Sequence, residues 1–137
     1  MKVILRLTSE QLRMLKDESR KTYPAEACAL LFGKLMDEEA VVTKVVVVSN
    51  VLRSPVKFEA DPQTVFNVFE KADQEGLEFI GLFHSHPAPA RPSMVDIKYM
   101  RLWGEAIWLI LSSNDGNIAA FQKTNINLHE VTLKVEA

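Results

Sequence analysis

The valine-rich run at residues 41–48 constrains the fold of this chain more than any other segment. Apart from Thr43 and Lys44 it consists of valine, a β-branched residue that packs well on a pleated sheet. A nearly uninterrupted apolar strand is typical of a sheet that is covered on both faces. In a sheet with one solvent-exposed face, apolar and polar residues alternate along each strand. The run therefore predicts a strand that is buried on both faces.

Shorter segments predict the elements around this strand. Further strands are expected at residues 3–8, 27–35, 79–83, 106–111, 118–122 and 128–135. Helices are expected to begin at the N-caps Ser9, Asp61 and Ser93 and to end near Thr22, Gly76 and Gly104. Strands and helices alternate at first, and the chain finishes in antiparallel strands. We therefore expect a mixed β-sheet packed with helices, in a single α/β domain over residues 1–137.

Composition excludes several classes of protein. The chain has 137 residues, 47% hydrophobic and 25% charged, which are ordinary proportions for a folded domain. The single cysteine, Cys28, rules out an intrachain disulfide and a cysteine-based zinc ribbon. A formal net charge of −2 gives no general attraction to nucleic acid, and the apolar runs are too short to span a bilayer. Since the charged N-terminal segment lacks a signal-peptide core, we expect a cytoplasmic protein with no membrane or nucleic-acid partner.

Two of the three histidines lie two residues apart, directly after the strand expected at 79–83. If the chain stays extended there, the side chains of His84 and His86 project from the same side. Asp96 follows ten residues after His86, beyond a loop that contains three prolines. Two imidazoles and a carboxylate leave one position of a tetrahedral zinc site open for water, which is typical of a catalytic zinc.

The same residues also have a simpler interpretation. A His-x-His pair by itself is a weak signal, and Ser93 and Asp96 have the spacing of a capping box. In that interpretation Ser93 caps a helix, and the charge of Asp96 suits the helix N-terminus. Spacing alone leaves both interpretations open.

Glu26 lies directly before the apolar strand expected at 27–35. A carboxylate near the interior of a domain is costly unless it is paired or has a chemical role. A zinc hydrolase needs a carboxylate that does not bind the metal, to take a proton from water and pass it to the leaving amine. Without the other motifs, a solvated glutamate at a strand edge is the favoured interpretation.

Taken together, these residues carry a family resemblance. Residues 24–33 (PAEACALLFG), 81–87 (GLFHSHP) and 92–96 (PSMVD) resemble the JAMM (MPN+) zinc metalloproteases, whose pattern is a distant Glu, then His-x-His, then Ser-x-x-Asp. The resemblance covers nearly the whole chain. It departs from the family pattern in one place, since six residues separate His86 from Ser93 where the family usually has seven.

The resemblance implies a role for each residue of the pattern. His84, His86 and Asp96 would hold one zinc ion per chain. Glu26 would be the general acid and base, and Ser93 would help to hold the oxyanion of the tetrahedral intermediate. The resemblance also implies an MPN fold, with layers like those of cytidine deaminases.

The resemblance further implies a substrate class, a ubiquitin-like small modifier whose amide bond after the C-terminal Gly-Gly is hydrolysed. The modifier tail would be held by strand addition, for which residues 53–58 are a candidate edge.

Two alternatives stay open: a processing peptidase for a sulfur-carrier protein in cofactor or cysteine biosynthesis, and a non-catalytic MPN scaffold. A scaffold of that kind lacks the metal ligands, which are present here. The identity of the modifier and the oligomeric state stay open, with a homodimer as one alternative.

Two other residues have chemistry that the pattern does not use. Cys28 lies in an apolar run, so we expect a buried small hydrophobic residue rather than a nucleophile. His129 is expected on the same side of the last strand as Val131 and Leu133. We therefore expect a structural histidine there rather than a fourth metal ligand.

Overall fold

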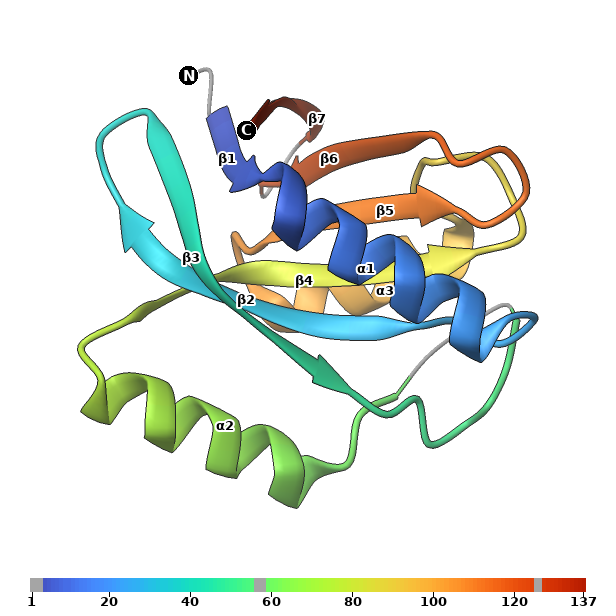
Figure 1. Ribbon diagram of the computed structural model, residues 1–137, viewed down its shortest axis with the longest axis horizontal. Helices are drawn as coiled ribbons and strands as arrows, with labels where there is room; N and C mark the ends of the chain where they lie inside the picture. Colours follow the sequence, from blue (N-terminus) through green and yellow to red (C-terminus); the bar gives the residue numbers. More distant parts are fainter. Residues whose placement is uncertain (1–3, 56–58, 125–126) are drawn as a thin grey trace.

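A computed structural model of the protein describes residues 4–55, 59–124 and 127–137 and has a mixed α/β fold, as expected (Figure 1). The strands are β1 (Ile4–Thr8), β2 (Cys28–Leu35), β3 (Glu39–Val48), β4 (Glu78–His86), β5 (Ile107–Ser112), β6 (Ile118–Lys123) and β7 (Leu128–Glu136). The helices are α1 (Ser9–Thr22), α2 (Pro62–Gln74) and α3 (Met94–Met100), and a 3-10 turn at Arg101–Trp103 continues α3. None of the described helices is long and apolar enough to cross a membrane.

The sheet closes into a barrel in the order β1-β3-β2-β4-β5-β6-β7. The last strand makes the closure, because β7 pairs antiparallel with β6 and parallel with β1, where Leu5 lies opposite Leu133. The antiparallel ending was expected from the sequence. The parallel pairing between the two ends of the chain was not predicted, since no local sequence pattern indicates that these two segments pair.

Side-chain caps fix the start of each helix. The predicted cap at Ser9 is wrong: Thr8 caps α1, because Thr8 and Gln11 form a complete capping box with bonds of 3.0 and 2.9 Å. The cap predicted at Asp61 is confirmed, since its carboxylate accepts the backbone N–H of Thr64 at 2.9 Å. Ser93 caps α3 as predicted.

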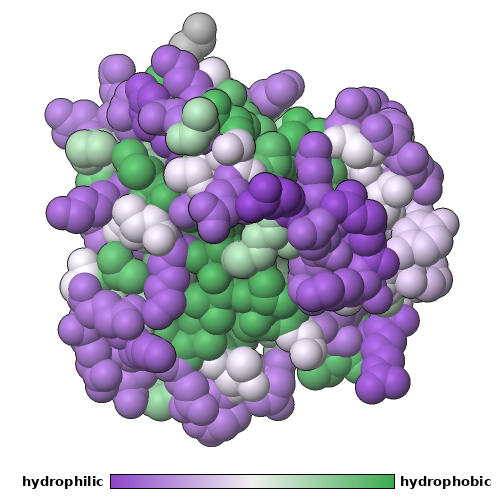
Figure 2. Space-filling view, in the orientation of Figure 1, coloured by the Kyte–Doolittle hydropathy of each residue, from purple (hydrophilic) through white to green (hydrophobic). Residues whose placement is uncertain are grey.

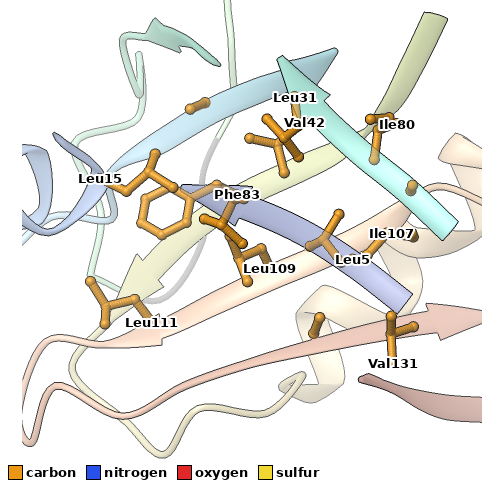
Figure 3. Close-up of a cluster of buried hydrophobic side chains, with 14 of the residues drawn as sticks. Leu5, Leu15, Leu31, Val42, Ile80, Phe83, Ile107, Leu109, Leu111 and Val131 are labelled. Carbon is orange, nitrogen blue, oxygen red and sulfur yellow. The ribbon is translucent and has the colours of Figure 1, made fainter. Parts of the chain in front are cut away.

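Two apolar clusters lie on opposite faces of the sheet. One fills the space between the sheet and α1, and it contains Leu5, Leu15 and Phe83 (Figure 3). The other lies between the sheet and the helices α2 and α3, and it contains Phe32 and Trp108. Since side chains alternate along a strand, β4 contributes to both clusters and is covered on both faces.

The prediction for the valine-rich run holds for its conformation and fails for its burial. Residues 41–48 lie in β3, but Thr43 and Val47 are exposed, Val47 by 37%. The pairing register with β2 shifts between Phe32 and Gly33. Because one extra residue is inserted in β3 there, the side chains that face a given side of the sheet are even-numbered in one half of β3 and odd-numbered in the other. Figure 2 shows an apolar area in the middle of one face of the molecule.

The strand that carries the histidines is longer than predicted. We expected a strand over 79–83 and a loop from His84, yet β4 continues through His86. Pairing on both sides extends it: His84 lies opposite Cys28 of β2 and Ile110 of β5. Both histidines therefore belong to a rigid element. Of the edge segment expected at 53–58, residues 56–58 lie outside the described residues.

We predict that Gly81→Ala lowers the free energy of unfolding by about 3 kcal/mol, because β4 and β5 would be forced apart. A Cβ atom at this position would lie 1.8 Å from the carbonyl oxygen of Ile107. Gly76→Ala is the matched control: the added atom meets open space, and the positive φ of 74° costs about 1 kcal/mol. Urea unfolding of both variants measures the difference, and equal losses would contradict the close approach of the two strands.

Candidate metal centre

The structure brings together three side chains from two elements. His84 and His86 project from the same face at the end of β4, and Asp96 lies in the first turn of α3. The Nε2 atom of His84 is 3.1 Å from Oδ2 of Asp96, and Nε2 of His86 is 3.6 Å from the same oxygen. One potential ligand atom from each residue lies within 4.8 Å of the other two.

This group fits a metal ion by distance and by chemistry. Tetrahedral ligands of zinc, each about 2.1 Å from the ion, are about 3.4 Å from one another, close to the separations observed here. All three side chains are buried, and Nε2 of His86 makes no hydrogen bond within the described part of the chain. Buried nitrogen atoms of this kind usually have a partner. The group could therefore hold a metal, with the mixed nitrogen and oxygen ligands that zinc accepts.

The two interpretations of the segment from Ser93 to Asp96 turn out to be compatible. The Ser93 hydroxyl accepts the backbone N–H of Asp96 at 3.1 Å, and the Asp96 carboxylate accepts the backbone N–H of Ser93 at 2.9 Å. This is a complete capping box. The oxygen that closes the box, Oδ2, is also the one that faces both imidazoles. Helix capping thus orients the carboxylate toward the histidines.

Glu26 is fully buried, so the interpretation as a solvated glutamate at a strand edge is wrong. Cys28 pairs with His84, and Ala27 and Ser85 exchange two hydrogen bonds of 3.0 and 3.1 Å. Continuing this register places Glu26 opposite His86, with the same side-chain parity as the two histidines. Neither carboxylate oxygen of Glu26 accepts a hydrogen bond from the described residues.

The pKa values of these groups are shifted by burial and by one another. Burial, and then the negative charge of Asp96, raise the pKa of Glu26 to about 8, although His86 acts in the opposite direction. Burial also acts to raise the pKa of Asp96, but the hydrogen bond to His84 and the nearby imidazole of His86 outweigh it and hold that pKa well below its usual range. Burial lowers the pKa of His86, whereas Asp96 and Glu26 raise it, with a net increase. The carboxyl groups of Asp96 and Glu26 therefore both favour the protonated form of His86.

The remaining candidates lie outside this group. Cys28 is buried, its thiol donates to the carbonyl of Val48 at 3.3 Å, and burial is the main cause that raises its pKa to about 12. A thiol with that pKa is a poor nucleophile at neutral pH, as expected. His129 is exposed on β7, with its ring 3.5 Å from the Thr124 hydroxyl, and is not among the clustered residues.

Sequence reasoning missed Asn50, which is the second residue after the end of β3. Its side-chain nitrogen donates to the carbonyl of Glu26 at 3.2 Å, and its oxygen accepts the backbone N–H of Leu52 at 3.0 Å. The second contact is an Asx turn, for which asparagine after a strand is a local signal. The first joins residues 24 positions apart, and nothing in the sequence pattern indicates it.

The chain is similar to known proteins over most of its length. A family described as prokaryotic homologs of the JAB domain matches residues 8–125. The desampylase of Pyrococcus furiosus is 41% identical over 112 residues, which cover 81% of this chain and 76% of the relative. The probable TtuB-protein conjugate cleaving protease of Thermus thermophilus is 39% identical over 95 residues, covering 65% and 61%. The solution structure of protein DSY2949 from Desulfitobacterium hafniense has the same fold, with a TM-score of 0.84 at 27% identity over 98% of this chain and 93% of that one.

We predict that His84→Ala loses zinc, because it removes one of the three clustered ligands, while His129→Ala keeps it. The second variant is a matched control, since it removes the histidine that lies outside the group. Metal content by elemental analysis, after both proteins are loaded with zinc and desalted, measures the outcome. Because His84 also packs edge-on against Trp108, Asp96→Asn serves as a second ligand variant of nearly unchanged shape. Unchanged zinc content in both ligand variants would refute the site.

Proposed function

This chain belongs to the family of prokaryotic homologues of the JAB domain, and from that premise we propose that it is a zinc-dependent isopeptidase. The proposed reaction is hydrolysis of the amide bond after the C-terminal Gly-Gly of a ubiquitin-like modifier. Glu26 carries this proposal: it is a fully buried carboxylate with no hydrogen-bond partner among the described residues, opposite a buried His-His-Asp group. The name of the Thermus thermophilus relative, a conjugate cleaving protease, supports the substrate class.

We propose that His84, His86 and Asp96 hold the zinc ion. When bound, zinc supplies Lewis acidity, which polarises the scissile carbonyl and makes water acidic enough to attack near neutral pH. The protein contributes a fixed set of ligands on β4 and α3, in an interior site where electrostatic interactions are stronger than in water.

Glu26 is the proposed general acid and base. Its carboxylate takes a proton from the attacking water as the new C–O bond forms, and it gives that proton to the departing nitrogen as the C–N bond breaks. The carboxylate is thereby restored at the end of the cycle. A glutamate that accepts hydrogen bonds from neighbouring side chains would be a weaker base, so the lack of such donors to Glu26 among residues 4–55, 59–124 and 127–137 supports this role.

Ser93 is the proposed donor to the oxyanion. Its oxygen accepts the backbone N–H of Asp96, which uses a lone pair of the hydroxyl and not its proton. The proton therefore stays available for a developing negative charge near the histidines. Donors held in place before the reaction begins stabilise such charge most effectively.

The same chemistry would cleave a linear precursor, so the processing peptidase remains the alternative. An isopeptide conjugate and a C-terminally extended precursor of the same modifier or sulfur carrier, assayed side by side, distinguish the two. A higher kcat/KM on the conjugate supports the isopeptidase, and a higher value on the precursor supports the processing peptidase.

We predict that Glu26→Gln lowers kcat on such a substrate by about 1000-fold, because the amide cannot accept the proton. The variant is expected to keep one zinc ion per chain, since Glu26 is not a ligand in the proposal. Glu105→Gln is the control for the same chemical change at an exposed position. Near-normal turnover by Glu26→Gln would remove Glu26 from this role.

A further inference from the structure

We infer that Asn50 is a positioning residue for Glu26, an inference that rests on the proposed function of that glutamate. Asn50 lies in the loop after β3 and hydrogen-bonds to the main chain of Glu26. The structure gives it the role of holding the glutamate at the end of β2 through its backbone, without contact with the reacting atoms.

No hydrogen bond from the described residues holds the side chain of Glu26. Neither carboxylate oxygen accepts a hydrogen bond from the described residues, so the backbone must set its position. Two contacts hold the peptide groups of this residue: its N–H donates to the carbonyl of Ser54 at 2.7 Å, and its carbonyl accepts from Nδ2 of Asn50 at 3.2 Å. Both come from the loop after β3, and Glu26 itself precedes the first residue of β2.

Asn50 also holds the loop together. Its Nδ2 atom donates to the carbonyl of Ser54 at 3.4 Å, and its Oδ1 atom accepts the backbone N–H groups of Leu52 at 3.0 Å and Glu59 at 3.1 Å. Two donors facing the oxygen and two carbonyls facing the nitrogen fix the orientation of the amide. One side chain therefore joins the turn after β3, the returning chain at Glu59 and the carbonyl of Glu26.

The other flank of Glu26 is held by the sheet. The Ser85 hydroxyl accepts the backbone N–H of Ala27, and the backbone N–H of Ser85 donates to the carbonyl of Ala27. Glu26 thus lies at the junction between sheet pairing on one side and the Asn50 loop on the other. Without the loop contacts, the residue would be held from one side only.

Asn50 and Glu26 also border the same pocket. Ser49, Asn50 and Arg53 line a pocket of about 510 Å³ together with Glu26. A displacement of this loop would therefore be transmitted to Glu26, the proposed acid and base, through the hydrogen bond from Asn50. Displacing a catalytic group by about 1 Å can lower the rate about 100-fold, so the expected effect is on kcat.

The test is Asn50→Asp, which has nearly the same shape and keeps an oxygen to accept from Leu52 and Glu59. It replaces the Nδ2 donor by an oxygen that repels the carbonyls of Glu26 and Ser54. Kinetics on the modifier conjugate are expected to show kcat lowered about 100-fold, with KM and zinc content within threefold of the parent protein. Asn67→Asp, exposed on α2, carries the same charge change and is expected to retain parental kinetics.

Amide hydrogen exchange followed by NMR gives a readout that needs no activity. In Asn50→Asp the amide of Glu26 is expected to lose protection, because its acceptor, the carbonyl of Ser54, also faces the side chain of residue 50 and would be repelled by the new oxygen. The amides of Leu52, Glu59 and Ala27 are expected to keep their protection. If Asn50→Asp does not fold, Asn50→Ser replaces it, since its hydroxyl still accepts from Leu52 but is too short to reach Glu26.

Either of two results overturns the role of Asn50: parental protection of the Glu26 amide, or a kcat equal to that of Asn67→Asp while the parent protein is active. A parent protein that cleaves no modifier substrate would instead refute the proposed function. In that case hydrogen exchange alone decides whether Asn50 holds Glu26.

Discussion

The antiparallel pairing of β2 with β4 determines where Glu26 lies relative to the two histidines. Cys28 lies opposite His84, and Ala27 bonds twice to Ser85, so Glu26 falls opposite His86. A slip of one residue would move Glu26 to the other face of the sheet, into the apolar cluster under α1. The bulges in β2 lie at residues 31–33, well away from the site, and leave this part of the register regular.

Asp96 shows how local structure and the site depend on one another. Its carboxylate closes the capping box of α3, and the same oxygen faces the two imidazoles on β4. The rotamer that satisfies the helix end is the one that completes the cluster. Because the box involves only Ser93 and Asp96, it moves as a unit with the helix end. The six-residue loop between His86 and Ser93 is compatible with a complete capping box at the start of α3.

Much of this arrangement follows from sequence, and the remainder depends on pairing between distant segments. Local signals predicted Asp61 and Ser93 as caps, and the spacing of His84 and His86 predicted a shared face. The end of β4 was misplaced because pairing with β2 and β5, rather than the local sequence, extends the strand through His86. The barrel closure and the exposure of Val47 have the same origin, since each depends on neighbours that are remote in sequence.

Glu26 shows most clearly why a motif is an incomplete description of a site. The proposed acid and base must exchange protons, and hydrogen bonds that hold its carboxylate in place would also stabilise the charged form and weaken it as a base. The protein meets both requirements by fixing the main chain on either side of the residue and, within the described part of the chain, leaving the carboxylate without donors. Residues that accomplish this act on peptide groups, so they need no catalytic chemistry of their own. For that reason a search by residue chemistry finds Glu26 and passes over Asn50.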